Sequence, residues 1–211
     1  EEIILSLFQW KEGKFEFKKA AEICKATIQK FPGSFGANNC KYLLARIEEK
    51  TLSFSVENVN TPDQPFRSLL KSKNLKKVYF RVAQGDFDEY KMLVYKKYGK
   101  QLVDVLKTMK IVSEWSLDLP DDGDNQAHSV EIKIPALPLG HYVILAGSNE
   151  KFEYSENGVA YSNCWISNLS YVTRSNNTDG TFEVRVFNRN TGEPIGNVSA
   201  ELFYQMYNYV T

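Results

Sequence analysis

Hydrophobic positions follow the period of a helix in the first quarter of the chain and the period of a strand after it. Two helical stripes, with apolar residues three and four positions apart, consist of Phe17, Ala20, Ala21, Cys24 and Ile28 and then of Ala37, Cys40, Leu43, Leu44 and Ile47. Pro32 and Gly33 lie between the stripes and favour a break. The pattern predicts a helical unit over residues 1–50. It consists of an α-hairpin and, before the hairpin, a shorter helix over Glu2–Trp10.

The first stripe is similar to the second helix of a tetratricopeptide unit, which has small residues early and a proline after the helix. Ala20, Ala21 and Pro32 match these positions. About one and a half such units fit into the segment, whereas a peptide-binding groove needs several consecutive repeats. We therefore expect a TPR-like hairpin that packs against the next domain or belongs to an array.

After residue 50, apolar and polar residues alternate, as in Leu52, Phe54 and Val56, and this period is typical of a half-buried strand. Further strands are expected over residues 77–83, 91–97, 110–119, 129–134 and 141–147. Residues 100–109 are the exception, because their apolar positions are spaced as on a short helix. The whole predicts a mainly β fold, an antiparallel immunoglobulin-like β-sandwich preceded by the hairpin.

An apolar run follows Pro138 and Gly140 and predicts a strand in the centre of a sheet. Tyr142 within this run either fills the core or mimics the corner tyrosine of sandwich domains.

The last part of the chain predicts two more strands, around Thr181–Phe187 and Val198–Tyr204. The connector Asn188–Asn197 is rich in asparagine, glycine and proline, so the chain reverses there. With the segment Cys164–Val172, this makes about three strands after residue 162. A sandwich has about seven strands, so three are too few for a complete one. We expect three units: the hairpin over 1–50, a sandwich over 51–162, and the start of a second, incomplete sandwich over 163–211. A longer parent chain is expected to continue the pattern.

The charge balance argues against nucleic acid as a partner. Lys plus Arg and Asp plus Glu both number 26, which gives a formal net charge of zero and no electrostatic funnel for a polyanion. No run of eighteen apolar residues exists, so direct membrane insertion of this segment is not expected. With 43% hydrophobic and 13% aromatic residues, the chain has enough apolar material for proper cores.

The three cysteines, Cys24, Cys40 and Cys164, form no metal-binding spacing with one another or with His128 and His141, so neither a metal nor a cofactor is expected. If the hairpin turns near residue 32, Cys24 and Cys40 lie at similar heights on the inward stripes. A disulfide there would close a loop of about 15 residues and stabilise the fold by about 3 kcal/mol. The alternative is a pair of free buried thiols that act as small hydrophobes.

Candidates for enzyme chemistry are few. They are the two histidines and the carboxylates Asp86, Asp88 and Glu89, which we interpret as a solvated connection between strands. No nucleophile stands in a strained elbow, so no catalytic residue is predicted. Residues 121–125 contain three aspartates and a glycine but lack the ligand order of a calcium loop, and an exposed acidic turn is expected. Three Asn-x-Ser/Thr triplets, at Asn168, Asn176 and Asn197, are interpreted as chance matches.

The order of these patterns resembles the N-terminal part of bacterial alpha-2-macroglobulin-like proteins, particularly those of Bacteroidetes. The resemblance rests on the helical KFPGSFGANNCKYLLARIEEK, the strand of IPALPLGHYVILAGS, then CWISNLSYVTRS and the strand–TGEPI–strand unit FEVRVFNRNTGEPIGNVSAELF. It implies macroglobulin-like sandwich domains in a secreted or periplasmic protein that is anchored to the membrane and inhibits endopeptidases by entrapping them. The thioester motif of many members, C-x-x-Q, is absent here, because Thr27, Leu43 and Ser167 stand where the glutamine would be.

The leading hypothesis is therefore a non-catalytic scaffold region of a peptidase-trapping inhibitor. Its partners would be peptidases, through the full-length protein, and the remaining domains of the same chain. The alternative hypothesis is a cell-surface adhesin or a carbohydrate- or protein-binding sandwich module, because its aromatic side chains could stack on sugars. Exposed Trp and Tyr side chains would favour the alternative, and a buried Trp115 and Trp165 would oppose it.

Overall fold

The computed structural model describes residues 16–120, 123–155, 157–175, 178 and 180–201. The helix expected over Glu2–Trp10 lies outside the described residues. Two helices, α2 (Phe17–Lys30) and α3 (Phe35–Glu48), form the predicted hairpin. Gly33 adopts a φ of 82°, which lets the chain reverse, and the Ser34 side chain caps α3 by accepting a hydrogen bond of 3.1 Å from the Ala37 amide.

Two sheets follow the hairpin. The smaller sheet is antiparallel, with the order β1 (Thr51–Val56), β3 (Phe66–Lys73) and β6 (Ala127–Ile134). The larger has the order β2 (Val59–Asn60), β8 (Val159–Ile166), β7 (Gly140–Gly147), β4 (Lys77–Gln84) and β5 (Lys110–Asp118). Among the strands of the described residues, only the short β2 runs parallel to its neighbour, β8. The fold is thus mainly β, with antiparallel and mixed sheets and some helices.

The main core lies between the two sheets. It contains Phe54 and Leu70 from the smaller sheet and Phe80, Ile144 and Ile166 from the larger one. Burial of each such side chain stabilises the fold by about 1.5–3 kcal/mol. Strand β7 lies in the middle of the larger sheet and is buried on both faces from residue 141 to residue 147, which confirms the expectation of a central strand.

Two helices cover the other face of the larger sheet. They are α4 (Phe87–Lys96) and α5 (Gly99–Leu106), and they bury Leu102 and Leu106 against Val143 and Leu145 of β7. Helix α5 confirms the helical expectation for this region. The strand predicted over 91–97 is wrong, because these residues belong to the end of α4 and the turn after it.

The interpretation of Asp86, Asp88 and Glu89 as a strand connection is also wrong. Asp86 is the N-cap of α4, and its carboxylate accepts hydrogen bonds from the amides of Asp88 (2.8 Å) and Glu89 (3.0 Å). The two acids occupy the first helical turn, where the helix dipole favours negative charge.

A separate two-stranded sheet follows, made of β9 (Leu169–Ser175) and β10 (Phe182–Asn188). The connector after β10 reverses as predicted, with positive φ at Gly192 and Asn197 and a bridge between Phe187 and Pro194. The strand predicted over Val198–Tyr204 is not formed in residues 198–201, and the rest of it lies outside the described residues. The boundary expected between residues 162 and 163 falls within β8, so the sandwich includes residues up to Ile166.

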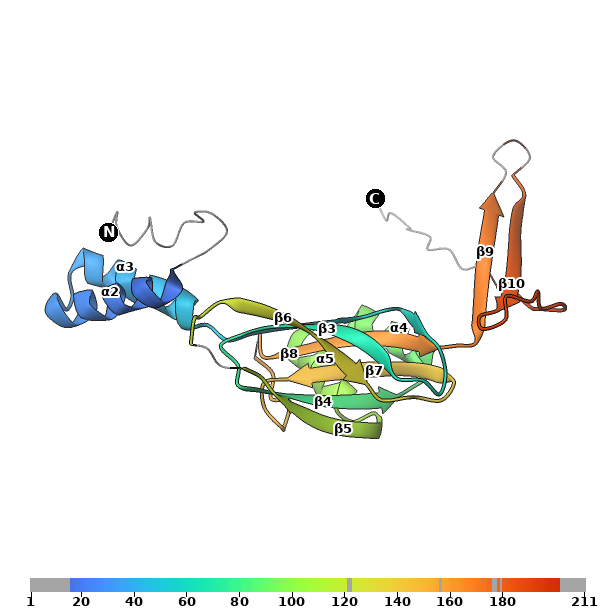
Figure 1. Ribbon diagram of the computed structural model, residues 1–211, viewed down its shortest axis with the longest axis horizontal. Coiled ribbons are helices and arrows are strands. Elements are labelled where there is room, and N and C mark those ends of the chain that lie inside the picture. Colours follow the sequence, from blue (N-terminus) through green and yellow to red (C-terminus); the bar gives the residue numbers. More distant parts are fainter. Residues whose placement is uncertain (1–15, 121–122, 156, 176–177, 179, 202–211) are drawn as a thin grey trace, which may run out of the picture.

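The three parts are arranged end to end (Figure 1). The hairpin lies at one end of the sandwich, and the β9–β10 sheet projects from the opposite end. The strand registers agree, since Thr51, the first residue of β1, pairs with Lys73 of β3, whereas Ile166, the last residue of β8, pairs with Gly140 of β7.

Candidate functional site

The joint between the hairpin and the sandwich is held by polar side chains. Asn74, in the turn between β3 and β4, donates hydrogen bonds of 2.9 Å from its amide nitrogen to the main-chain oxygens of both Ile47 and Glu49. Asn74 adopts a φ of 54°, a conformation that asparagine tolerates better than most residues. Asn157, in the segment between β7 and β8, donates a hydrogen bond of 2.7 Å to the Glu49 carboxylate.

Lys73 adds a charged contact to this joint. Its ammonium donates a hydrogen bond of 2.8 Å to the main-chain oxygen of Arg46, near the end of α3. The same ammonium lies 5.3 Å from the centre of the Phe17 ring, within range of a cation–π interaction. Burial lowers the pKa of Lys73, an effect that the carboxylate of Glu49 opposes. The joint thus satisfies the free carbonyls at the C-terminal end of α3, where positive charge is favoured by the helix dipole.

The opposite end of the sandwich holds an aromatic cluster around His141. The imidazole of His141 lies 5.1–5.2 Å, centre to centre, from the rings of Phe87, Tyr90 and Trp165. Tyr90 donates a hydrogen bond of 3.3 Å to the side-chain oxygen of Asn163, whose nitrogen lies 3.4 Å from Nε2 of His141. The cluster therefore connects α4 with strands β7 and β8.

His141 is buried, and its Nδ1 has no hydrogen-bond partner among the described residues. Burial lowers the pKa of His141, while the main chain of Gly85 and the carboxylate of Asp86 act in the opposite direction. The neutral imidazole is thus the favoured form at neutral pH. This arrangement suits a packed core histidine that joins helix to sheet.

The structure does not bring the two histidines together. His128 pairs with Ser72 at the end of the sandwich next to the hairpin, whereas His141 pairs with Trp165 at the other end. Nε2 of His128 lies 3.1 Å from the carboxylate of Asp124, which belongs to the expected acidic turn. The candidate carboxylates Asp86, Asp88 and Glu89 lie at the start of α4. Among the described residues, no group of three or more His, Cys, Asp or Glu side chains could hold a metal ion.

A cavity of about 280 Å³ opens beside His128. Leu75, Leu119 and Val130 supply its apolar lining, and Asp124 and His128 supply part of its polar lining. The carboxylate of Asp124 also accepts a hydrogen bond of 2.7 Å from the amide of Gln126, so it supports the turn. Residues 121 and 122 of the same turn lie outside the described residues.

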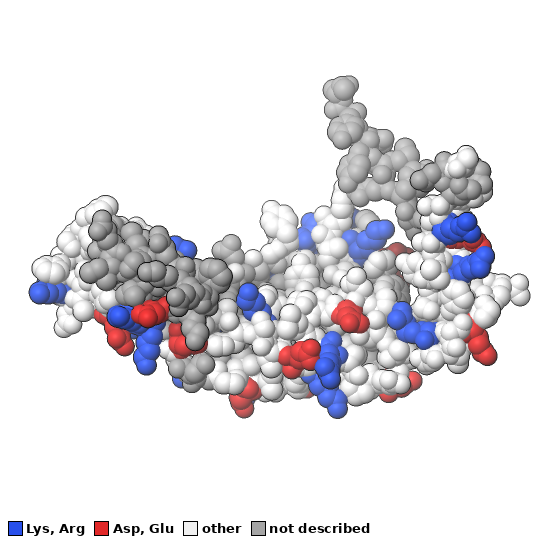
Figure 2. All heavy atoms as spheres, turned by 45° about the horizontal axis from the view of Figure 1, so that its top comes forward, with Lys and Arg blue, Asp and Glu red and all other residues white. Residues whose placement is uncertain are grey.

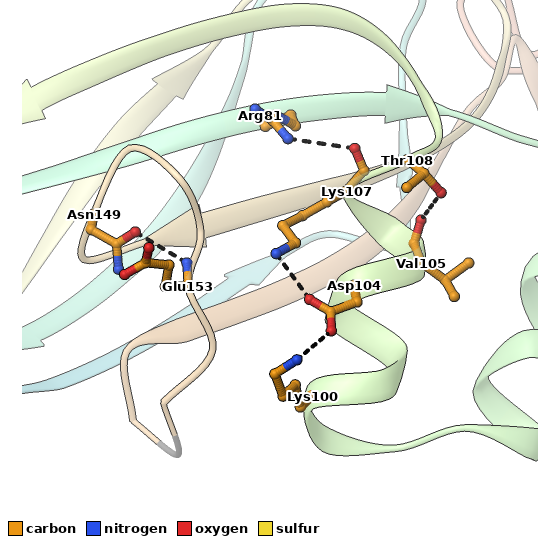
Figure 3. Close-up of polar contacts among 8 residues, drawn as sticks. All are labelled: Arg81, Lys100, Asp104, Val105, Lys107, Thr108, Asn149 and Glu153. Carbon is orange, nitrogen blue, oxygen red and sulfur yellow. Dashed lines mark hydrogen bonds and ion pairs between the residues drawn. The ribbon is translucent and has the colours of Figure 1, made fainter.

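Charged side chains on the helices pair locally. Asp104 of α5 accepts hydrogen bonds from Lys100 and Lys107, at 2.8 and 2.9 Å, and these contacts, that of Lys100 first, lower the pKa of Asp104 (Figure 3). Arg81 of β4 contacts the Lys107 main-chain oxygen at 3.5 Å. Figure 2 shows the same mixing of signs over the visible face, with acidic and basic side chains side by side. The described residues of this face form no extended surface of one sign for a polyanion.

The tryptophans give a mixed result. Trp115 is partly buried in the main core and stacks on Phe80 with ring centres 5.1 Å apart. Trp165 retains 39% exposure, as does Tyr161 on the same face of β8. Tyr142 combines both roles considered for it, because its ring is buried and its hydroxyl donates a hydrogen bond of 3.0 Å to the main-chain oxygen of Pro138, four residues earlier.

The cysteines lie in two places. Cys24 and Cys40 face each other between α2 and α3, and Cys164 lies in the core of the sandwich. All three thiols are free and buried, so the disulfide stays a prediction. Sequence reasoning missed Asn74 and Lys73, although an asparagine in the polar segment before Leu75 is a recognisable turn signal. No helix in the described parts of the chain is both long and apolar enough to span a membrane.

Comparisons with known proteins find no match in sequence and only weak similarity between this structure and solved structures. No family model matches the sequence, and no curated protein matches it. Among solved structures, the chain is similar to native alpha-2-macroglobulin from Escherichia coli spanning domains MG0-NIE-MG1, at 11% identity over 68% of this chain and 47% of that chain, with a TM-score of 0.48. This chain therefore spans about half the length of that fragment.

Two other similar structures are a CARDB domain from Pyrococcus furiosus in complex with di-metal ions and a superoxide reductase (neelaredoxin) from Ignicoccus hospitalis. The CARDB domain is 12% identical over 56% of this chain and 92% of its own, with a TM-score of 0.33. The reductase is 10% identical over 64% of this chain and 97% of its own, with a TM-score of 0.29. All three similarities lie below a TM-score of 0.5 and assign this chain to no family, and the Bacteroidetes origin has no support from these comparisons.

Proposed function

We propose that this chain is a non-catalytic scaffold region of an alpha-2-macroglobulin-like protein that inhibits endopeptidases by trapping them. The observation that carries the proposal is the end-to-end arrangement, in which one sandwich holds its two neighbours at opposite ends. A frame of consecutive domains needs this arrangement, because each unit must fix the position of the next. The patterns quoted above for the family resemblance add to this support.

The joint at the hairpin also supports a structural role. Asn74 and Lys73 bind main-chain oxygens at the end of α3, so the hairpin is attached through several directional contacts as well as through the linker. Directional hydrogen bonds restrict rotation about a linker more than apolar contacts do. The TPR-like hairpin would thereby act as a fixed extension of the sandwich.

The β9–β10 sheet supports a second, incomplete sandwich. Leu169, Tyr171, Phe182 and Val184 lie on one face of this sheet, and all four are exposed. The opposite face carries Arg174, Glu183 and Arg185. The charged side chains are thus confined to one face, which also carries Val172 and Phe187, and a face without charges is typical of a sheet whose apolar side belongs to a domain core.

The proposal places the protein in the periplasm or outside the cell, anchored to a membrane through the parent protein. Its partners would be peptidases and the other domains of the same chain. To test it, the protein in its natural full length is incubated with several peptidases, and hydrolysis of a large protein substrate and of a small peptide substrate is followed. Trapping predicts loss of activity on the large substrate alone. Unchanged activity on both substrates would reject the proposal.

The chain alone provides a matched control. As a scaffold region without the trapping machinery, residues 1–211 should leave peptidase activity on both substrates unchanged. Inhibition of small-peptide hydrolysis by this segment would instead indicate direct blocking of an active site and would contradict the proposed role.

The second candidate function, a carbohydrate-binding surface module, draws on the partial exposure of Tyr161 and Trp165 on one face of β8. Aromatic rings on one face could stack on a sugar. Binding of an oligosaccharide panel by the chain, lost in Trp165→Ala and kept in Trp115→Phe, would favour this candidate over the scaffold.

A further inference from the structure

The interior of the hairpin contains a pair of cysteines. Cys24 of α2 is fully buried and Cys40 of α3 is nearly so, and together they form the buried centre of a small apolar cluster. Ile23, Ile28, Leu43 and Leu44 pack around them. The side chains of the two cysteines interact directly, with a hydrogen bond between the thiols. The helices therefore hold two sulfur atoms side by side, away from solvent.

We propose that Cys24 and Cys40 form a disulfide bond when the chain folds in an oxidising compartment. One thiolate attacks a sulfur of an external disulfide, such as oxidised glutathione or a protein disulfide carrier, and expels one thiol. The second cysteine then attacks the mixed disulfide and expels the second thiol. The pair loses two protons and two electrons in all, and the external disulfide is reduced to two thiols.

The bond forms before the hairpin is fully packed. Burial, together with Cys40, raises the pKa of Cys24 to about 12, so the thiolate is scarce in the folded hairpin at neutral pH. In the unfolded chain the thiols regain ordinary reactivity, and folding then places the formed bond out of reach of reductants. Cys164 is the less favoured partner in the unfolded chain, because it lies much further along the sequence and closing the longer loop costs more entropy.

The bond would make the hairpin a covalently closed unit. α3 is already bound to the sandwich through Asn74, whereas the contacts of α2 are chiefly with α3. A crosslink over a loop of this length lowers the population of the opened hairpin by about a hundredfold. The proposal does not depend on peptidase trapping, since an adhesin exposed outside the cell would meet the same oxidising conditions.

The test is to refold the chain in a mixture of reduced and oxidised glutathione and then to alkylate it in denaturant. Mass spectrometry counts the alkylated cysteines before and after reduction. We expect one before reduction, mapped to Cys164, and three after it. Three alkylated cysteines before reduction, or a bond that includes Cys164, would overturn the proposal.

Trypsin gives a second readout, which the wild-type chain supplies and two variants extend. Cleavage after Lys30, at the turn between the helices, separates α2 from α3. With the bond, the two fragments remain together on a non-reducing gel and separate on a reducing one. The matched variants are Cys164→Ser, which should keep the linked fragments, and Cys40→Ser, which should lose them. Separation of the fragments of the Cys164→Ser variant on both gels would also contradict the bond.

Discussion

The side-chain amide of Asn74 lies 2.9 Å from the main-chain oxygen of Ile47, and this hydrogen bond joins the sandwich to the last buried residue of α3. A turn between two strands thus completes the end of a helix in the neighbouring unit. The same amide nitrogen also reaches Glu49. Loss of this side chain should therefore weaken the joint and leave the packing of both hydrophobic cores unchanged.

Asn74→Gly should destabilise the chain by about 1 kcal/mol, because two partly exposed hydrogen bonds are lost while glycine keeps the positive φ. Asn74→Ala should cost about 1 kcal/mol more, because alanine disfavours that conformation. Thermal unfolding measures both values, and hydrogen exchange at the end of α3 locates the effect. Equal stability of the two variants and the wild type would show that the joint does not depend on Asn74.

His141 should make the stability of the sandwich depend on pH. Its pKa is lowered in the folded state, so between the ordinary value of about 6.5 and the lower folded value the unfolded chain binds more protons. Stability is therefore fully present above pH 6.5 and falls as the pH drops through this window. In His141→Leu, which cannot titrate, the fall in melting temperature from pH 7.5 to 5 should be smaller than in the wild type.

The control for that experiment is His128→Gln, which removes an exposed imidazole from the other end of the sandwich. It should leave the contribution of His141 in place. A wild-type pH dependence in His141→Leu would contradict the assignment.

Tyr142→Phe should lower stability by about 1 kcal/mol. The variant keeps the buried ring but loses the hydroxyl that donates to the oxygen of Pro138. For a chain of this size the melting temperature should fall by roughly 2–4 °C. Tyr95→Phe, in which the tyrosine is exposed on α4, is the matched control and should have no effect. Equal melting temperatures for Tyr142→Phe and the control would argue that the hydroxyl is dispensable.

Amide hydrogen exchange should separate the two β units. Strand β7 has neighbours on both sides and cover on both faces, whereas β9 and β10 pair only with each other in the described part of the chain. A two-stranded sheet alone is marginally stable in water. Amides of residues 169–175 should therefore exchange at least a hundredfold faster than those of residues 142–146. Similar protection in both would mean that another segment covers the β9–β10 sheet.

Several elements could be predicted from the sequence because their signals are local. The hairpin followed from two apolar stripes around Pro32 and Gly33, and α5 followed from its spacing. The central place of β7 followed from an unbroken apolar run. In each case the burial seen in the structure is what the period of the side chains requires.

Helix α4 shows why the remainder was missed. It contains Tyr90, Val94 and Tyr95, residue types that favour a strand. Asp86 and Glu89, however, stand three positions apart at its start, as in a capping box. The capping signal at Asp86 outweighs the strand preference of the residues that follow it. The boundary within β8 was missed for another reason, since the polar Asn163 in the strand is satisfied by Tyr90, a contact 73 positions away in the sequence.

The joint and the His141 cluster could not be derived from the sequence, because each depends on long-range contacts. Asn74 reaches back 27 residues to Ile47. His141 meets Trp165 only when β7 pairs with β8, and it meets Phe87 only when α4 lies on the sheet. The local periodicity of apolar residues does not predict long-range side-chain contacts of this kind. The sequence could offer Cys24 and Cys40 as partners because the hairpin that joins them is itself local.

The end-to-end arrangement has a mechanical consequence. Tension between the hairpin and the β9–β10 sheet would enter at the start of β1 and leave at the end of β8, so the load runs along the strands. Under such shear, the hydrogen bonds between β1 and β3 and between β8 and β7 bear the force together and cannot separate one at a time. The sandwich would then transmit tension from the hairpin to the β9–β10 sheet with little extension of its own.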